Sequence, residues 1–278
     1  MLLRISLRSA AKDAVQGISM NEELKEKNPI QVAGRVMGAL EFLSDNGPTG
    51  LMELATALHL NKSTAHRAVS SLEYMGYVRQ DPSNGKYSAT FKVVEMANHI
   101  MEKMNIIDVV RPHLTRLMEK TGETVHLVRM DGADVVYIDK VESFDPSMRM
   151  ASHIGFRMPF YRSAVGKALA ARMPAAEVKK LWDQCTIERT TPYTITNYED
   201  FLYNLEEVRR RGYALDNEEN ESGVRCIAAS LDTGRSADGL YAFSISVPIA
   251  RMDNDRIREL AEYVLQTKKE IDREFLRG

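Results

Sequence analysis

Residues 50–79 carry the pattern that most restricts the fold of this chain: two short helical repeats joined by a tight polar turn. In the second repeat, Ala65, Val69 and Leu72 recur at i, i+4 and i+7, on one face of a helix. The opposite face carries hydroxyls and an arginine, at Ser63, Thr64, Arg67, Ser70 and Ser71. A helix with one aliphatic face and one hydroxyl-and-arginine face suits a DNA major groove. We therefore expect a helix-turn-helix whose second helix contacts DNA.

The neighbouring segments predict a winged helix-turn-helix over residues 30–90. Apolar residues within 32–43 recur at helical spacing and give a first helix. Asn61 is placed to cap the DNA-contacting helix with its side chain, and Gly76 to end it. Two short strands follow, and the Asn84-Gly85 pair between them is typical of a hairpin turn, the wing.

The formal net charge of −2 does not argue against nucleic acid, because phosphate contacts are local. Residues 59–92 hold five lysines and arginines against two acidic residues, a local charge of +3. The rest of the chain is neutral to acidic, which fits a DNA-binding domain attached to a sensor domain. The residues predicted to contact DNA are Lys62, Ser63, Thr64, His66, Arg67 and Ser70 on the helix, with Arg79 and Lys86 on the wing.

Composition and motifs limit the classes of function. With 278 residues, 44% of them hydrophobic, the chain is long enough for two globular domains. No apolar run approaches the roughly 20 residues of a membrane span, so no membrane partner is expected. Cys185 and Cys226 lie far apart, which predicts a reducing, cytoplasmic setting without disulfides. No catalytic motif and no metal-ligand spacing of His or Cys occurs, so we predict no catalytic residue, no metal and no cofactor.

The first 29 residues are predicted to be a leader outside the folded domains. Within residues 1–19, Asp13 is the only acid beside three basic residues, and a secretory apolar stretch is lacking. Met20 starts a sequence typical of a bacterial N-terminus. Residues 1–19 are therefore interpreted as an upstream start or a disordered leader, with a targeting segment as the alternative.

A linker helix is expected over residues 91–105. Its apolar stripe contains Val93, Ala97, Ile100, Met101 and Met104. Two interpretations stay open: the stripe packs on its own domain, or it pairs with its copy in a dimer, because an unpaired apolar face would be exposed.

Residues 106–278 are predicted to form an α+β domain with a largely antiparallel sheet. Pro112 predicts a break in the helical region that precedes Gly122. The further elements expected are a hairpin of strands 124–130 and 135–141, a helix 164–172 capped by Ser163, a helix entered through the capping box 196–199 and ended by Gly212, a strand 240–248 and a final helix over 257–271.

The strand 240–248 offers a candidate binding surface. Alternation places Ala242, Ser244 and Ser246 on one face, where small hydroxyl residues form either a polar pocket wall or a surface in water. The helix opening after Ser163 supplies N–H groups that suit a carboxylate, although ordinary capping explains the same residues. Asp216, at a strand end, fits either this site or surface solvation. Cys226 fits a plain buried position as well.

Several ordered motifs resemble the IclR family of bacterial regulators. Lys62–Arg67 and Leu72–Val78 are similar to that family's recognition helix and wing. The resemblance covers about residues 30–275 and continues through Thr121–Leu127, Ser163–Ala168, Arg209–Glu219, Gly223–Ala229 and Phe243–Pro248.

The resemblance implies a winged helix-turn-helix, a linker helix and a C-terminal GAF-like effector-binding domain. It also implies homodimers, often paired into tetramers, on palindromic operators in double-stranded DNA. In family members that sense small oxo-acids, the matching effector-binding positions are Ala164, Val165, Asp216, Cys226, Ser244 and Ser246. The sequence departs from many members at Tyr161-Arg162 and is similar to the subgroup that regulates 2-keto-3-deoxygluconate catabolism.

These observations predict a DNA-binding transcriptional repressor, not an enzyme, whose operator affinity is controlled by a small organic acid such as a 2-keto sugar acid. Three alternatives stay open at this point. The effector is an aromatic acid or another compound, the second domain serves assembly without any effector, or the second domain is an enzyme that acts on a small acid.

Overall fold

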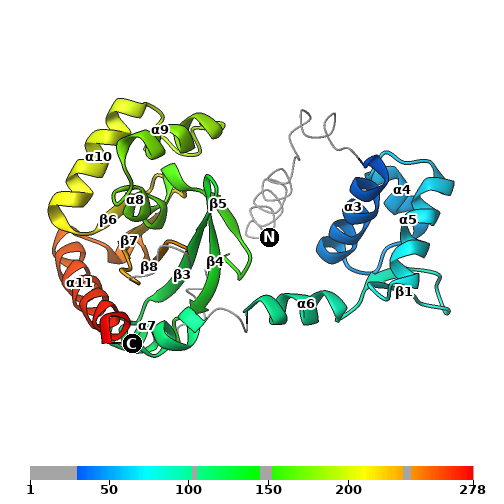
Figure 1. The fold of residues 1–278 in the computed structure, drawn as a ribbon, viewed down its shortest axis with the longest axis horizontal. Coiled ribbons are helices and arrows are strands. Elements are labelled where there is room, and N and C mark those ends of the chain that lie inside the picture. Colours follow the sequence, from blue (N-terminus) through cyan, green and yellow to red (C-terminus); the bar gives the residue numbers. More distant parts are fainter. Residues whose placement is uncertain (1–29, 102–104, 145–151, 234–238, 278) are drawn as a thin grey trace. The chain divides into compact units, whose positions relative to one another are not determined.

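The computed structural model describes residues 30–101, 105–144, 152–233 and 239–277. These residues form two compact units, one on each side of residues 102–104 (Figure 1). The predicted leader over residues 1–29, and Met104 of the predicted stripe, lie outside the described residues.

The first unit is a three-helix domain with a two-stranded hairpin and a following helix. The two strands pair antiparallel, with Val78 opposite Ala89. The core gathers aliphatic side chains from all three helices, including Leu43, Leu54 and Leu72. In chain order the elements are α3 (Gln31–Asn46), α4 (Leu51–Ala57), α5 (Lys62–Tyr74), β1 (Val78–Gln80), β2 (Tyr87–Ala89) and α6 (Lys92–Met101). The predicted three helices and wing are thereby confirmed.

Local chemistry fixes the ends of α5 as the sequence predicts. The Asn61 side chain accepts a hydrogen bond from the Thr64 N–H at 2.8 Å, which satisfies one orphan donor of the first turn. Gly76 follows the helix with a φ of +80°, a conformation that costs other residues energy. Its N–H donates to the Glu73 carbonyl at 2.9 Å. The helix α5 therefore begins and ends where capping chemistry places it.

The structure of α6 bears on the two interpretations of its apolar stripe. Val93 packs against the core of the first unit, as one interpretation expects. Ala97 and Ile100 are exposed, and so are Phe91 and Val94 on the same segment. Most of this helix thus has no cover within its own unit.

The second unit is built on one six-stranded sheet in the order β5-β4-β3-β8-β7-β6, with every neighbouring pair antiparallel (Figure 1). The predicted α+β class with an antiparallel sheet is confirmed. Its elements are α7 (Asn105–Thr121), β3 (Thr124–Asp131), β4 (Asp134–Val141), β5 (Arg157–Pro159), the 3-10 turn η3 (Phe160–Arg162), α8 (Ala164–Ala170), α9 (Ala175–Gln184), α10 (Tyr198–Arg211), β6 (Ala214–Asn217), β7 (Val224–Ser230), β8 (Tyr241–Pro248), η5 (Ile249–Arg251) and α11 (Asn254–Arg277).

Helices cover both faces of this sheet. The helices α7 and α11 pack together and against one face, and the short helix α8 packs on β6, β7 and β8 from the other, with α10 beyond it (Figure 1). Because successive residues of a strand point to opposite faces, β8 is buried on both. The unit therefore has apolar packing on both sides of one layer of strands.

Three details differ from the sequence-based predictions. Pro112 lies inside α7 rather than at a break, and the helix persists because Val110 and Leu114 are fully buried in tertiary contacts. The cap of α10 is Asn197, not Thr196, whose hydroxyl instead accepts from Arg189 at 2.9 Å. The strands β5 and β7 were not predicted, because β5 has only three residues and β7 shows no alternation of buried and exposed positions.

Gly166 allows α8 to approach the turn η3 closely. A Cβ at this position would lie 2.1 Å from the Phe160 carbonyl oxygen, closer than any real side chain can sit. Position 166 therefore requires a glycine because no side chain fits against η3. Its backbone is not left-handed, so conformational freedom is not the reason.

We expect Gly166→Ala to lower the unfolding free energy of the second unit by about 1–3 kcal/mol, because the added methyl overpacks against backbone. Urea unfolding followed by the fluorescence of Trp182, the single tryptophan, reports this unit. The matched control is Gly38→Ala on α3, where nothing lies within 4 Å of the added Cβ. The unfolding free energy of the Gly38→Ala variant, followed by circular dichroism, should stay the same or rise by about 0.5–1 kcal/mol. Equal behaviour of the two variants would contradict the packing argument.

Candidate nucleic-acid interface and effector site

The structure places all eight predicted DNA-contacting residues on accessible surface of the first unit. Ala65, Val69 and Leu72 are buried against α3 and α4, which turns the opposite face of α5 outward. On that face four side chains are exposed and two are partly exposed; on the hairpin both basic residues are exposed. The exposed residues are Lys62, Ser63, His66, Arg67, Arg79 and Lys86, and the partly exposed ones are Thr64 and Ser70.

The basic groups of this surface are available for phosphate or base contacts. Within the described residues, Lys62, Arg67 and Lys86 form no ion pair. Lys92, which adds to the local positive charge, behaves differently. Its Nζ donates to the Met75 carbonyl at 2.7 Å and lies over the Tyr77 ring. Lys92 therefore stabilises the end of α5 and is engaged within its own unit.

The predicted effector residues meet on the face of the sheet that α8 covers. Asp216 on β6 pairs with Cys226 on β7, and Cys226 pairs with Ser246 on β8. Directly opposed residues of antiparallel strands point to the same face, so these three side chains form one polar row. Ser244 follows two residues along β8 on that face. The helix that begins with Ala164 and Val165 packs over these strands.

Burial decides between the interpretations left open for the serine face and for Asp216. Ser244 and Ser246 are 3% and 5% exposed, and Asp216 is 4% exposed. The alternatives of a serine face in water and of a solvated surface aspartate are therefore wrong, because α8 and its neighbours cover this face. Buried polar groups need hydrogen-bond partners, from the protein or from a ligand.

The polar row contains a continuous set of close contacts. The Cys226 thiol lies 3.2 Å from the Ser246 hydroxyl, which lies 3.4 Å from Nδ1 of His126. Nε2 of His126 lies 2.7 Å from the Ser152 hydroxyl. Burial raises the pKa of the Cys226 thiol, with the Asp216 carboxylate adding to the rise. Burial lowers the pKa of His126 to about 3, so both groups are neutral at pH 7.

Asp216 is held by the turn that follows β6. Its Oδ1 accepts from the Glu219 N–H at 2.7 Å and from the Asn220 N–H at 3.4 Å. Burial raises the pKa of this carboxyl to about 7, and the charge of Glu219 acts in the same direction. Lys167 and the two N–H donors lower it. Asp216 can therefore carry a proton near neutral pH and donate a hydrogen bond to an anion.

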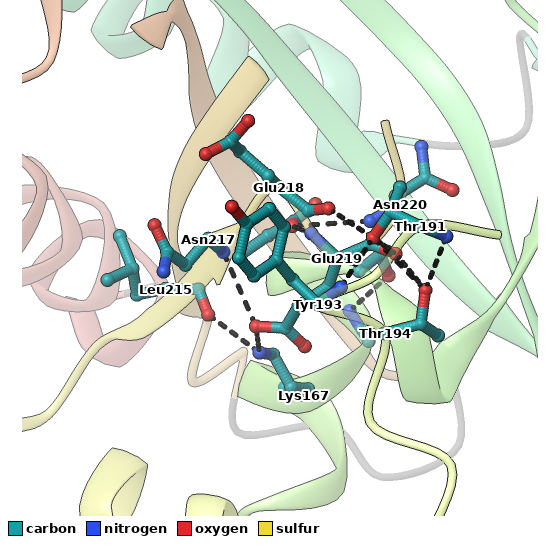
Figure 2. Close-up of polar contacts among 12 residues, drawn as sticks. Lys167, Thr191, Tyr193, Thr194, Leu215, Asn217, Glu218, Glu219 and Asn220 are labelled. Atoms are coloured by element: carbon teal, nitrogen blue, oxygen red, sulfur yellow. Dashed lines mark hydrogen bonds and ion pairs between the residues drawn. The ribbon is translucent and has the colours of Figure 1, made fainter. Parts of the chain in front are cut away.

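A buried ion pair links α8 to the same turn (Figure 2). Lys167 is fully buried, and its Nζ donates to Oε1 of Glu219 at 2.5 Å and to the Leu215 carbonyl at 2.6 Å. Sequence reasoning missed this pair, although a lysine inside the otherwise apolar segment 164–170 was a usable signal. The pair fixes α8 relative to Asp216.

Threonines of the loop before α10 hold the backbone of this turn (Figure 2). Thr191 Oγ1 donates to the Glu218 carbonyl at 2.6 Å, and Thr194 Oγ1 to the Glu219 carbonyl at 2.7 Å. Glu218 has a φ of +62°, a left-handed conformation that is unfavourable for glutamate. Sequence reasoning missed this loop as well, because its contacts are with residues more than 20 positions away.

The N-terminus of α8 completes the candidate site. The Ser163 hydroxyl accepts from the Gly166 N–H at 3.1 Å, as predicted. Within the described residues, the N–H groups of Ala164 and Val165 donate to no backbone or side-chain acceptor, although both residues are buried. Two unsatisfied donors beside a carboxyl that can carry a proton are suited to an organic acid.

Two properties of the described residues bear on the class of site. No helix among the described residues is both long and apolar enough to cross a membrane. In the same part of the chain, no group of three or more His, Cys, Asp or Glu side chains could hold a metal ion.

Comparison with known proteins identifies the architecture. Residues 98–273 match the family model described as the C-terminal domain of the bacterial transcriptional regulator IclR, and residues 32–82 match the IclR helix-turn-helix domain. The chain belongs to the IclR family. The IclR-family relatives are transcriptional regulators, so the chain is a DNA-binding transcriptional regulator and not an enzyme.

Individual relatives extend over most of the chain. It is 35% identical over 236 residues to the HTH-type transcriptional regulator KdgR of Escherichia coli (strain K12), covering 84% of this chain and 89% of that protein. It is 32% identical over 246 residues to the transcriptional repressor IclR of the same organism, covering 87% of this chain and 89% of that protein. The crystal structure of the Thermotoga maritima IclR superposes with a TM-score of 0.74 at 32% identity, covering 87% of this chain and 98% of that one.

The raised pKa of Asp216 predicts a stability that depends on pH. Because the folded pKa of about 7 exceeds the ordinary 3.8, the folded IclR-family domain binds more protons than the unfolded chain between these values. Its unfolding free energy should fall as pH rises through that window and level off above it. Asp216→Asn should remove this loss, and Asp183→Asn, at an exposed carboxylate, should not. Urea unfolding followed by Trp182 fluorescence at several pH values measures the unfolding free energy. If this free energy changed with pH in parallel for wild type and Asp216→Asn, the raised pKa would not belong to Asp216.

Proposed function

We propose that this IclR-family regulator is a repressor whose operator affinity is controlled by a small hydroxylated organic acid, such as a 2-keto sugar acid. The observation that carries the proposal is the polar row of buried Asp216, partly buried Cys226 and buried Ser246 on the face that α8 covers, together with the unsatisfied N–H groups at the start of α8. The effector carboxylate takes the N–H groups of Ala164 and Val165, where the backbone dipoles favour negative charge. Its carbonyl and hydroxyl groups meet the row.

The chemistry of the row favours a hydroxylated acid over an aromatic one. Hydroxyls can donate to Asp216 and exchange hydrogen bonds with Ser244 and Ser246. Asp216 and Ser246 already have protein partners, but the Ser244 hydroxyl has none within the described residues. A flat apolar ring over Ser244 would leave that hydroxyl unsatisfied, which costs about 1–3 kcal/mol. The preference therefore follows from satisfying polar groups that the fold has already removed from water.

On the DNA side, we propose that Arg67, Ser63 and Thr64 contact base edges, and that Arg79 and Lys86 contact phosphates. The support is the exposed basic and hydroxyl surface of α5 and the hairpin. Lys62, His66 and Ser70 complete this surface. One recognition helix contacts only a few base pairs, so useful specificity requires two half-sites.

We propose that two copies bind a palindromic operator as a dimer, which can pair further into a tetramer. The support is α6, where Val94 is 48% and Ile100 is 64% exposed within the single chain. An apolar helix face of this kind needs cover, and a second copy supplies an identical face. Effector binding then changes DNA affinity if the bound form favours one arrangement of the two winged helices, a coupling of about 1–3 kcal/mol.

We expect Arg67→Ala to weaken operator binding by about 1–3 kcal/mol and to relax base preference, because a base-edge contact is lost. Lys86→Ala should weaken binding to all DNA sequences alike, because a phosphate contact is lost. It should also reduce the slope of log affinity against log salt concentration by about 1. Fluorescence polarisation with a duplex selected from random DNA, at several salt concentrations, measures both. Arg258→Ala on α11 is the control. Unchanged affinity for Arg67→Ala would show that α5 does not contact the operator through this residue.

The effector assignment predicts a separation of functions. Asp216→Ala combined with Ser246→Ala should leave operator binding intact and abolish release by 2-keto-3-deoxygluconate, because only the acid contacts are removed. Calorimetry measures acid binding, and polarisation measures operator release. The control is Asp183→Ala, an exposed residue of α9. A full response in the double variant would place the effector elsewhere, and a response to an aromatic acid alone would favour the aromatic alternative.

A further inference from the structure

Tyr137 reaches the effector face because of an irregularity in the β3–β4 ladder. His126 pairs with Lys140 and Leu127 with Asp139, but Val128 pairs with Tyr137, so Ile138 is an extra residue. In an uninterrupted ladder, Val128 would face Ile138, and Tyr137 would point to the face that α7 covers. A β-bulge of this kind redirects side chains, often next to functional sites. Here it turns Tyr137 toward α8.

The surroundings of Tyr137 are those of the candidate effector site. Its side chain belongs to the same buried cluster as Ala164, Val165 and the partly buried Cys226. Its ring lies between two others, with centroids 5.0 Å from His126 and 5.6 Å from Phe156, both edge to face. Two such neighbours hold the ring in one orientation. The position of the hydroxyl is therefore fixed before any ligand arrives.

The Tyr137 hydroxyl is a polar group without a protein partner. Tyr137 is only 8% exposed, yet within the described residues its hydroxyl makes no hydrogen bond, and neither does that of Ser244. Neither hydroxyl oxygen is among the fully buried, unpartnered atoms of the described residues, so each reaches space that a ligand can occupy. Burial raises the pKa of the Tyr137 hydroxyl, with Cys226 and Asp216 adding to the rise. The group therefore stays protonated and can donate.

The polar groups of this face are spread along β8. Ser246 lies in the row of Asp216 and Cys226, Ser244 in the next row with His126, and Ala242 in a third row with Val128, opposite Tyr137. Adjacent rows are two residues apart, about 7 Å along a strand. A ligand that reaches both the row of Ser246 and the row of Tyr137 must therefore be elongated and must carry polar groups at both positions.

We propose that Tyr137 is a specificity-determining residue whose hydroxyl donates to a hydroxyl group of the effector that lies beyond the row of Asp216, Cys226 and Ser246. This inference rests on the proposed effector site. It makes the site selective for a polyhydroxylated keto acid over a short keto acid that presents the same carboxylate and carbonyl. The selective group lies on β4, two rows from the row of Asp216, Cys226 and Ser246.

The test compares 2-keto-3-deoxygluconate with pyruvate, which shares the keto-acid end and lacks the hydroxylated tail. Calorimetry is done on the full chain, its Tyr137→Phe variant and, as control, Tyr203→Phe at an exposed tyrosine of α10. Tyr137→Phe should weaken the six-carbon acid about three- to tenfold, the loss of one hydrogen bond, and leave pyruvate unchanged. Tyr203→Phe should change neither. Melting temperature and operator affinity of Tyr137→Phe should match wild type.

Three results would overturn the inference. Undiminished binding of the six-carbon acid by Tyr137→Phe, while the Asp216 and Ser246 double variant loses it, would leave the effector site intact and remove Tyr137 from it. An equal loss for both acids would show a structural role only. Failure of the wild-type chain to bind either acid would remove both this inference and the proposed keto-acid effector.

Discussion

The buried pair of Lys167 and Glu219 is the interaction on which the rest of the effector domain depends. It joins α8 to the turn after β6, and through the Glu219 N–H it fixes the Asp216 carboxyl. Buried ion pairs often add little net stability, because desolvation offsets the attraction. Removing one partner is costly, however, at about 3–5 kcal/mol. The pair is therefore best understood as a device that sets the position of α8 over the sheet.

Once α8 is in place, the antiparallel register determines which chemistry gathers beneath it. Residues from four strands that are far apart in sequence, such as Asp216, Ser246 and His126, come to one face because they occupy paired positions. The bulge in β4 adds Tyr137 to that face. Helix cover then removes water, which keeps Cys226 and His126 neutral and lets Asp216 carry a proton near pH 7. Neutral donors around free N–H groups suit an organic acid better than a cation.

The winged helix-turn-helix depends much less on long-range contacts. Asn61 caps α5, Gly76 ends it and Asn84-Gly85 turns the hairpin, all through neighbours a few residues away. Such signals depend only on neighbouring residues, so the sequence predicted these elements and the outward face of α5 correctly. For the same reason, the family resemblance and the fold class were predictable, and the family models confirm them.

The sequence by itself determined the helix α5 with its outward polar face, the Ser163 cap, the alternation along β8 and the residue types of the polar row. Only the tertiary structure decided that the serine face and Asp216 are buried, that Pro112 is tolerated inside α7, and that Lys167 pairs with Glu219. It also decided that Tyr137 faces α8. The bulge responsible shifts the register by one residue, and the sequence around it gives no sign of this shift. The physical reason is range: caps and turns act over a few residues, whereas burial, register and ion pairing depend on segments brought together from across the chain.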